Sequence, residues 1–338
     1  MIKVGIVGFG FMGRMHYACW SELADAEIVV VCDANPNIIE DTKNAIGNIE
    51  GAAEQIDFDS FKLYSDFDEM IAKEKLDVIS ITLPTYLHPD FTIKSLKAGV
   101  NVLCEKPMAL NADECQRMAE AAKQTKKYLM IAHCIRFWPE YAETKNIIDS
   151  GKYGKVLAAT FKRVGSPPNW AADEWFFDES RSGGMALDLH IHDTDYVQYL
   201  FGMPKAVCSH AQQTSTGNLT HVVTEYDYDD DTLVTAEAGW LMTPAFGFEM
   251  SFNIMLEKAT IVYDCTRAPA FRVCTDTGEV ITPEVSGSTG YSLQTAHFAK
   301  IITGQSTPDV TDLLQSENSV KISLAEIESA RKGQKVDL

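Results

Sequence analysis

The sequence lacks the features that mark secreted and membrane-spanning proteins. Its eight cysteines include no Cys-x-x-Cys pair, and several lie in apolar runs, as Cys32 and Cys104 do, where cysteine behaves as a small hydrophobic residue. No apolar run approaches the length of a membrane span. The first strand is expected to begin at Ile2, which leaves no room for a signal peptide. These absences predict a reduced, cytoplasmic protein that is not embedded in a membrane.

Basic residues are also scarce. There are 29 Lys and Arg residues against 48 Asp and Glu residues, which gives a formal net charge of -19. Nucleic-acid binding depends on Lys and Arg to neutralise phosphates, so this balance argues against a nucleic-acid partner. A small anionic substrate is not excluded, because local basic groups such as Lys162, Arg163 and Arg181 could hold one.

The length of 338 residues predicts two domains, because single cores rarely grow to that size. Over residues 1–125, short β-branched runs alternate with helical patterns, which predicts an α/β domain with a doubly wound parallel sheet. Over residues 126–338, strand follows strand from Lys205 to about Val285, with helices before and after. This second pattern predicts an α+β domain with a large, mostly antiparallel open sheet.

A glycine motif opens the chain in "KVGIVGFGFMGRMHY". Gly8, Gly10 and Gly13 form G-x-G-x-x-G directly after an expected strand and at the start of an expected helix. Gly8 permits a tight turn, Gly10 lets the backbone approach a pyrophosphate, and Gly13 lets helix and strand pack closely. The helix start, with Phe11 and Met12, offers free N–H groups to phosphates. The motif predicts a dinucleotide-binding Rossmann domain; a glycine-rich turn without a ligand is the alternative.

Asp33 ends the second expected strand, 20 residues after Gly13. Its carboxylate can accept hydrogen bonds from both hydroxyls of an adenosine ribose. It would repel a 2′-phosphate, since two unit charges about 4 Å apart at an effective dielectric of about 20 interact by roughly 4 kcal/mol. Ala34 and Asn35 follow rather than an arginine, so NAD is predicted in preference to NADP. Asp33 could also cap the helix that is expected to begin near Pro36.

Acids and histidines cluster in "SGGMALDLHIHDTDYVQYLFG". If Gly184–Leu200 forms a helix, Asp188, His192 and Asp195 share one face, while His190 lies about 200° around the axis from Asp188. A His-x-His metal site needs a strand, so no metal is predicted. The Asp188–His192 pair suits a general base, because the carboxylate can orient the imidazole. The alternative is a solvated surface, but the apolar residues around the pair indicate a buried helix.

A third motif, Glu105-Lys106-Pro107, ends the apolar run "NVLCEKPMAL". With the glycine loop and the Asp-x-x-x-His helix, it resembles the glucose-fructose oxidoreductase, inositol dehydrogenase and rhizopine catabolism (Gfo/Idh/MocA) family over nearly the whole chain. The segments "TLPTYLHPDF" and "GYSLQTAHFAKIITG" are similar to that family too. The resemblance implies a Rossmann domain that binds NAD and a second domain whose open sheet makes a homodimer or homotetramer. Its implied catalytic set is Lys106, Asp188 and His192, and its implied nicotinamide end consists of Thr82, Pro84, His88, Glu105, Lys106 and Pro107.

The resemblance also explains why a strand ends on Glu105-Lys106-Pro107. In a doubly wound fold, ligands bind beyond the carboxyl ends of the strands. Lys106 would polarise a substrate hydroxyl, and Pro107 would fix the backbone direction, with a cis bond before it conceivable. His192 would remove the hydroxyl proton as hydride passes to the nicotinamide, and Asp188 would orient His192 or bind a substrate hydroxyl. The alternative for Glu105 and Lys106 is an exposed ion pair.

The expected substrate is a sugar or polyol. Trp170 and Trp175 lie among polar residues in "FKRVGSPPNWAADEWFFDESRSGG", and aromatic faces with hydrogen-bonding groups suit such a ligand, although packing explains them equally well. Further candidates to reach the substrate are Arg136, Arg163 and Tyr291.

The leading hypothesis is an NAD-dependent dehydrogenase of an inositol-like polyol, an aldose, or an amino or nucleotide sugar. An NAD-using glycosidase of the same family and a non-catalytic NAD-binding sensor are alternatives. A metal-dependent hydrolase built on His190 and His192 is a more remote one. The sequence does not name the sugar, and His190 stands where the family often has another residue.

Overall fold

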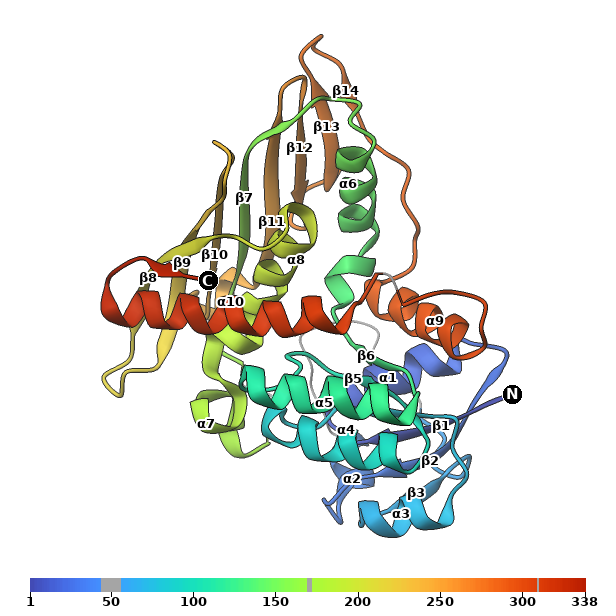
Figure 1. The fold of residues 1–338 in the computed structure, drawn as a ribbon. Helices are drawn as coiled ribbons and strands as arrows, with labels where there is room; N and C mark the ends of the chain where they lie inside the picture. The colour runs from blue at the N-terminus through green and yellow to red at the C-terminus, as the bar shows by residue number, and fades with distance from the viewer. Residues whose placement is uncertain (44–55, 169–171, 309) are drawn as a thin grey trace. The chain divides into compact units, whose positions relative to one another are not determined.

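The computed structural model of the protein describes residues 1–43, 56–168, 172–308 and 310–338, which form two compact units (Figure 1). Unit 1 consists of Met1–Cys134, Asn169–Trp175 and Gly290–Glu317, and unit 2 consists of Ile135–Pro168, Phe176–Thr289 and Asn318–Leu338. The predicted division into 1–125 and 126–338 takes no account of the later segments that join unit 1. The reason lies in packing: Phe298 of helix α9 (Gly290–Ile302) belongs to the same buried hydrophobic cluster as Trp20 of α1 (Phe11–Ser21).

Unit 1 is built on a parallel sheet, as its alternating strand and helix patterns predict. The strand order is β3-β2-β1-β4-β5-β6, which is the order of dinucleotide-binding folds. The apolar strands are covered on both faces, and all four residues of β4 are buried. The strands are β1 (Ile2–Val7), β2 (Ala26–Cys32), β3 (Lys62–Tyr64), β4 (Val78–Ile81), β5 (Asn101–Cys104) and β6 (Leu129–Ile131). The other helices are α2 (Ile38–Lys43), α3 (Phe67–Lys73), η1 (Thr85–Leu87), α4 (His88–Lys97) and α5 (Ala112–Thr125).

Unit 2 contains a larger sheet, with the order β14-β13-β12-β11-β7-β10-β9-β8-β15. The pair β7–β10 is parallel and the other pairs of the described strands are antiparallel. This confirms the expected mostly antiparallel sheet. The strands are β7 (Val156–Gly165), β8 (Ala206–Gln213), β9 (Leu219–Asp227), β10 (Leu233–Gly239), β11 (Phe248–Leu256), β12 (Ala259–Asp264), β13 (Phe271–Thr275), β14 (Val280–Ile281) and β15 (Val336–Asp337).

One face of this large sheet packs against helices and the other is open. In Figure 1, α6 (Pro139–Asp149), α8 (Ile191–Phe201) and α10 (Leu313–Lys332) run along the same face. Strand residues that point toward them, such as Phe161 and Phe252, are buried beside Tyr141 and Tyr196. Residues that point away are exposed, among them Thr160, Val223, Glu225 and Asn253. The remaining short helices are η2 (Cys134–Phe137), η3 (Ala172–Phe177), α7 (Glu179–Ser182), η4 (Ala186–His190) and η5 (Pro244–Phe246).

Within the described residues, no helix combines the length and the apolar character needed to cross a membrane.

Candidate active site

The glycine loop between β1 and α1 has the geometry of a phosphate cradle. Gly8 has a φ of +86°, and a Cβ there would lie 2.8 Å from the carbonyl oxygen of Thr82. A Cβ on Gly13 would lie 2.1 Å from the carbonyl oxygen of Gly8. A Cβ on Gly10, in contrast, would have no atom of the described structure within 4 Å. The loop is therefore closed on the side of the sheet and open at Gly10, where a pyrophosphate would approach.

The first backbone N–H groups of α1 have no side-chain cap, so they are available to a pyrophosphate. Its N-cap residue is Gly10, and no side-chain cap hydrogen bond is made there. Phe11 and Met12, the first two helical residues, are half-buried. A helix start without a capping side chain offers N–H donors and a positive dipole end to phosphate oxygens. The residues present thus fit a bound dinucleotide.

Thr82, at the end of β4, supports the loop from the next strand. Its hydroxyl lies 2.5 Å from the carbonyl oxygen of Gly8 and 3.1 Å from that of Val7. Its backbone N–H donates to the carbonyl oxygen of Val7 at 2.9 Å. Thr82 therefore holds the turn at Gly8 in place.

Asp33 follows β2, and both of its carboxylate oxygens already accept backbone hydrogen bonds. Oδ2 accepts from the N–H of Phe9 at 2.6 Å, and Oδ1 accepts from the N–H of Asn35 at 2.9 Å. Each carboxylate oxygen has a second lone pair, so acceptor capacity remains for a ribose. The alternative role is a cap of the next helix, but α2 begins at Ile38, and the two N–H groups bound by Asp33 belong to Phe9 and Asn35, which lie outside it.

Glu105 and Lys106 follow β5, and the carboxylate of Glu105 turns inward. Its Oε1 lies 2.9 Å from Nε2 of His16 in α1, and its Oε2 accepts the N–H of Lys106 at 3.2 Å. Burial on its own would raise the pKa of Glu105, but the hydrogen bond and charge of His16 and the nearby Lys106 bring it below its usual value. Because Glu105 is 6% exposed and its partner is His16, the alternative of an exposed Glu105–Lys106 ion pair is wrong. The peptide bond between Lys106 and Pro107 is cis.

His88 links the two loops that carry Pro84 and Pro107. Its Nδ1 lies 2.8 Å from the carbonyl oxygen of Pro107, and its Nε2 lies 2.8 Å from that of Leu83. Burial lowers the pKa of His88, and the two carbonyl groups offset part of this effect. A neutral ring has one N–H and donates to one carbonyl at a time. Since each nitrogen faces a backbone carbonyl of one loop, His88 stabilises the positions of both loops. Pro84, four residues before His88, is half-buried.

In unit 2, the segment that carries Asp188 and His192 is helical over the expected range, but it contains a π-helical turn. Residues Ala186–His190 form a π-helical turn, and the α-helix α8 begins only at Ile191. The two glycines before the turn are required, since Gly183 has a φ of +78° and a Cβ there would lie 2.4 Å from the side chain of Leu187. Asp188 and His192 are both half-buried.

Asp195, which is expected to share a face with Asp188 and His192, is bound within unit 2. Asp195 is buried, and its carboxylate binds the guanidinium of Arg136 through two contacts of 2.7 and 2.8 Å. His190 also turns inward, with Nε2 3.5 Å from Oε2 of Glu326, so it does not point the same way as His192. This orientation argues against a metal site built on His190 and His192.

Two of the predicted substrate residues prove to be structural. Arg163 is 3% exposed and binds Asp193 at 2.8 and 3.1 Å, and Arg136, which pairs with Asp195, is 2% exposed. Each guanidinium group makes two contacts with one carboxylate inside unit 2. This pairing offsets the hydration free energy that an isolated buried charge would lose. The prediction that they reach a substrate is corrected accordingly. Trp175 and Tyr291 are half-buried and stay candidates, and Trp170 lies outside the described residues.

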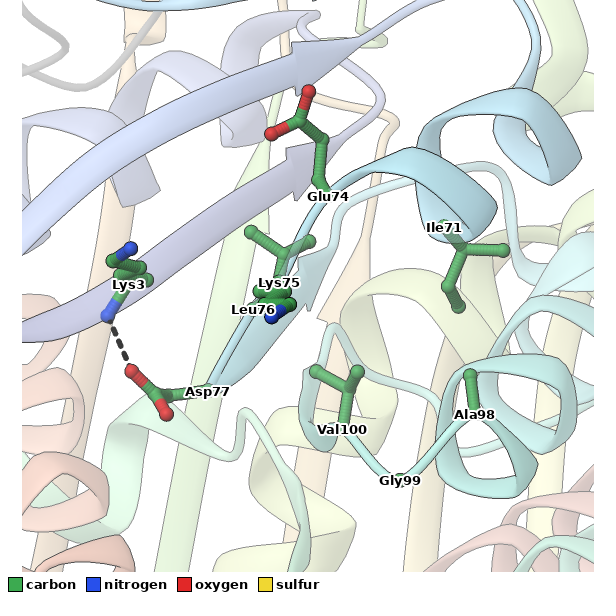
Figure 2. A pocket seen from close by; sticks show the side chains of 9 residues that line it. All are labelled: Lys3, Ile71, Glu74, Lys75, Leu76, Asp77, Ala98, Gly99 and Val100. Atoms are coloured by element: carbon green, nitrogen blue, oxygen red, sulfur yellow. Dashed lines mark hydrogen bonds between the residues drawn. The ribbon is translucent and has the colours of Figure 1, made fainter.

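A separate pocket of about 460 Å³ lies at the amino ends of the strands of unit 1 (Figure 2). Lys3 of β1 lines it, and the backbone N–H of Lys3 donates to Oδ2 of Asp77 at 2.8 Å. Asp77 and Val100 precede β4 and β5, so the pocket is at the edge opposite to Gly8, Thr82 and Glu105. Ligands of this fold bind beyond the carboxyl ends, so the pocket is not the predicted dinucleotide site.

Comparison with known proteins agrees with the resemblance found in the sequence. Residues 2–133 match the profile described as "Oxidoreductase family, NAD-binding Rossmann fold", and residues 141–262 match the GFO/IDH/MocA C-terminal domain. The chain is 30% identical to an uncharacterised oxidoreductase of Streptococcus pneumoniae over 68% of its own length and 58% of that protein. It is 31% identical to 2,7-anhydro-N-acetylneuraminate hydratase of Mediterraneibacter gnavus over 69% and 57%. These matches therefore span less than two thirds of those two relatives.

A third relative aligns over nearly its full length. The chain is 26% identical to scyllo-inositol 2-dehydrogenase (NAD(+)) of Bacillus subtilis over 100% of its own length and 96% of that protein. Among solved structures, levoglucosan dehydrogenase in complex with NADH and levoglucosan has the same fold, with a TM-score of 0.81, 22% identity and coverage of 99% of both chains. From the matched profiles and the geometry of unit 1, the chain belongs to the Gfo/Idh/MocA oxidoreductase family and has an NAD-binding Rossmann domain.

Proposed function

We propose that the protein is an NAD-dependent dehydrogenase that oxidises a hydroxyl group of a sugar or polyol. The observation that carries the proposal is the position of Glu105-Lys106-Pro107. It lies at the carboxyl end of β5, in the same unit as the open glycine loop, and its acid is bonded to α1 through His16. A lysine at that edge is where an NAD enzyme needs a cation to stabilise developing alkoxide charge.

Residues of the chain bind and orient the substrate and take up the hydroxyl proton. NAD, when bound, supplies the acceptor for the hydride that leaves the substrate carbon. In our proposal Lys106 donates a hydrogen bond to the reacting hydroxyl, and an imidazole nitrogen of His192 takes the hydroxyl proton. Asp188 orients the His192 ring or binds a second substrate hydroxyl.

We assign the cofactor-binding residues by their places around the loop. Gly8, Gly10, Phe11, Met12 and Gly13 would hold the pyrophosphate, and Asp33 would bind the ribose and disfavour NADP. Thr82, Pro84, Glu105 and Pro107 would border the nicotinamide end, with His88 bracing them.

The substrate class is proposed from the relatives' names together with the half-buried Trp175 and Tyr291. One relative is an inositol dehydrogenase, another a levoglucosan dehydrogenase of Pseudarthrobacter phenanthrenivorans at 30% identity over 61% of this chain. Polyols and sugars present hydroxyls and apolar ring faces, which aromatic side chains and hydrogen-bonding groups recognise.

A second candidate function is a reaction in which NAD is reduced and reoxidised within one turnover. It is favoured by the similarity to two 2,7-anhydro-N-acetylneuraminate hydratases, the second from Escherichia coli at 29% identity over 69% of this chain. Such an enzyme would accumulate no net NADH. A glycosidase that uses NAD in the same way belongs to this class.

We also propose a homodimer or homotetramer that forms through the open face of the large sheet. Support comes from the uncovered Val223 and Leu233 on that face, at 44% and 55% exposure. Light scattering coupled to size exclusion tests it: a monomer at micromolar concentration would contradict the proposal.

The decisive experiment follows NADH absorbance with inositols, aldoses, levoglucosan, amino sugars and nucleotide sugars, with NAD and NADP in parallel. Net reduction of NAD by one class identifies the dehydrogenase and its substrate. The same panel, with 2,7-anhydro-N-acetylneuraminate added, is examined by mass spectrometry for products. Product without net NADH would establish the second function instead, and bound NAD without any product would favour a sensor.

A further inference from the structure

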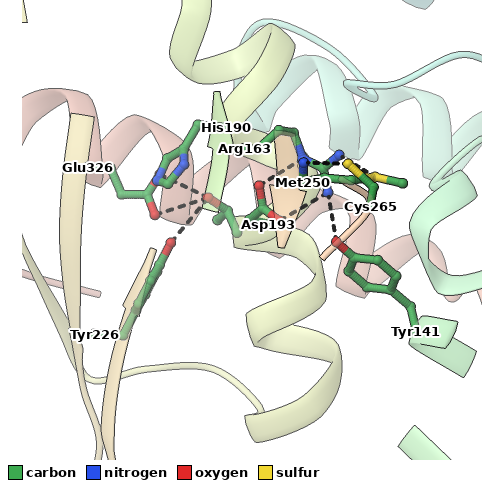
Figure 3. A network of polar contacts seen from close by, with 9 residues as sticks. Tyr141, Arg163, His190, Asp193, Tyr226, Met250, Cys265 and Glu326 are labelled. Atoms are coloured by element: carbon green, nitrogen blue, oxygen red, sulfur yellow. Dashed lines mark hydrogen bonds and ion pairs between the residues drawn. The ribbon is translucent and has the colours of Figure 1, made fainter. Parts of the chain in front are cut away.

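A carboxyl group that the catalytic proposal does not use lies buried in unit 2. Glu326, on α10, is 0% exposed, and both of its oxygens lie 3.1 Å from the hydroxyl of Thr194 in α8. Its Oε2 is 3.5 Å from Nε2 of His190, and the hydroxyl of Tyr226 on β9 is a further hydrogen-bond partner. Figure 3 shows His190 and Tyr226 converging on this carboxyl from different elements. Glu326 thus ties α10, α8, the π-turn and the sheet together.

The two contacts on the catalytic segment bracket His192. His190 lies two residues before His192 and ends the π-turn, and Thr194 lies two residues after it, in α8. Both point to the buried side, while Asp188 and His192 are half-buried. Glu326 therefore contacts the buried face of the segment on both sides of the junction between the π-turn and α8.

Neighbouring residues of the segment are fixed as well, but by different chemistry. Asp193 and Asp195 are each held by an arginine, Arg163 and Arg136. Glu326 contacts hydroxyl groups and an imidazole instead (Figure 3). A buried carboxylate paired with an arginine is charged and compensated, whereas a carboxyl among hydroxyls is most stable as the neutral acid.

The charge states agree with this chemistry. Burial raises the pKa of Glu326 to about 8, and burial lowers the pKa of His190 to about 3. At neutral pH the two groups are therefore a neutral acid and a neutral imidazole, and their 3.5 Å contact is not an ion pair. Loss of the proton would create a second negative charge beside Asp193, within a cluster that also holds Tyr226 and Thr194. The other charged or titratable groups whose fields reach the pair are Arg163, His221 and Tyr228.

We infer that Glu326 is a positioning residue: by accepting the hydrogen bond of Thr194 and packing against the ring of His190, it fixes the junction of the π-turn and α8 and thereby the placement of His192 relative to Asp188. The inference rests on the proposed function, in which His192 is the base. His192 lies between the two residues that Glu326 contacts, in the same short helical segment, so a shift of His190 or Thr194 would be passed to His192 through the helix backbone. Misplacement of a reacting group by about 1 Å can cost a hundredfold in rate.

The test compares three variants with the wild type in the full-length protein. Glu326→Gln keeps the shape and hydrogen bonding of the neutral acid, Glu326→Leu removes both, and Thr194→Val removes one contact without changing the size of the side chain. Glu328→Gln is the matched control, since Glu328 lies on the same helix but is exposed. The readouts are kcat and KM with the substrate found in the panel, NADH affinity by fluorescence, and the histidine signals in a protein labelled with nitrogen-15 at histidine.

Glu326→Leu is expected to lower kcat about tenfold or more and to shift the His192 signal, with NADH affinity within about twofold of wild type because the cofactor loop is in the other unit. Glu326→Gln should rescue both kcat and the His192 signal at pH 7. Wild-type kcat should change near pH 8, and this step should be absent in Glu326→Gln. The inference is overturned if Glu326→Leu keeps the wild-type kcat and His192 signal.

The histidine signals separate this inference from the proposed function. If no substrate turns over in the wild type, an unchanged His192 signal in Glu326→Leu still overturns the inference, and a changed one that Glu326→Gln restores still supports it. If Glu326→Leu does not fold, Thr194→Val decides: a His192 shift in the same direction supports the coupling, and its absence overturns it.

Discussion

The imidazole of His16 and the carboxylate of Glu105 meet at 2.9 Å in the interior of unit 1, although 89 residues separate them in the sequence. His16 belongs to α1, the helix that begins at the glycine loop, and Glu105 immediately precedes Lys106. One buried contact therefore couples the element that would hold the pyrophosphate to the residue that would polarise the substrate.

Replacement of Glu105 by Gln is expected to lower the free energy of unfolding by about 2 kcal/mol at pH 7, because it removes a charged acceptor from a buried hydrogen bond. The pKa of Glu105 is lower in the folded protein than its ordinary value of 4.5. Its ionised form therefore stabilises the fold above pH 4.5, and this contribution is lost as pH falls through the lower, folded-state pKa.

Urea unfolding at pH 7 and at pH 3.5 measures the effect. The difference between wild type and Glu105→Gln should shrink at the lower pH, and Glu69→Gln, on the surface of the same unit, should show neither effect. An equal difference at both pH values would mean that Glu105 is not ionised in the folded state.

Lys106→Ala is expected to reduce kcat by a factor of a hundred or more, because it removes the cation that stabilises developing negative charge on the substrate oxygen. NAD binding should change little, since the glycine loop and Asp33 are intact. Isothermal titration with NAD and initial rates with the identified substrate check the two halves of this prediction. Lys123→Ala, on the exposed part of α5, is the control. Full activity of Lys106→Ala would remove Lys106 from the mechanism.

Asp33→Ala is expected to relax the preference for NAD over NADP, because the repulsion of a 2′-phosphate disappears. It should also weaken NAD binding about tenfold, since the ribose loses a charged acceptor and the N–H of Phe9 loses its partner. Asp33→Asn separates the two effects: its amide oxygen can still accept from Phe9, so the loop is kept and only the charge is lost. Affinities for both cofactors are compared, with Asp25→Asn as the exposed control. Unchanged discrimination in both variants would exclude Asp33 as the selector.

The fold was largely predictable from local patterns. Helix α6 runs over Pro139–Asp149 as expected, because proline at its first position and the polar end set its limits. Strand β11 is confirmed over Phe248–Leu256, where alternate residues are buried. Strong periodicity with clear boundaries suffices for such elements.

The sequence suffices to propose candidate site residues, but it does not give their geometry. The π-turn at Ala186–His190 has no signal in the helical period, and the approach of His190 to Glu326 joins residues that are far apart in the sequence. Likewise, nothing local indicates that Arg136 and Arg163 are held by Asp195 and Asp193, since the partners meet only in the folded unit. His16 and Glu326 cannot be identified from the sequence for the same reason, because each meets its partners only in the folded unit.

Glu326 and His190 make opposite contributions to the dependence of folding stability on pH. Their different pKa values leave a pH range in which, of the two, only Glu326 contributes. Glu326 has a folded pKa of about 8 against an ordinary 4.5, so its stabilisation is complete below pH 4.5 and is lost as pH rises to about 8. His190 has a folded pKa of about 3 against an ordinary 6.5, so the stability linked to it is lost as pH falls below 6.5. The two slopes oppose each other between pH 4.5 and 6.5, and Glu326 acts alone between about 6.5 and 8.

Glu326→Gln is therefore expected to abolish a fall in stability that the wild type shows between pH 6.5 and 8, with a slope of up to about 1.4 kcal/mol per pH unit. The variant should be the more stable protein at pH 8. In the wild type, ionisation of Glu326 favours the unfolded state at this pH, whereas the amide of Gln does not titrate. Urea unfolding at half-unit intervals measures the difference between the two proteins, from which groups that titrate equally in both cancel. Glu328→Gln should follow the wild type throughout. If the difference in unfolding free energy between wild type and Glu326→Gln is constant from pH 6.5 to 8, the buried carboxyl is already ionised at neutral pH. Glu326 would then contact Thr194 and His190 as a carboxylate anion.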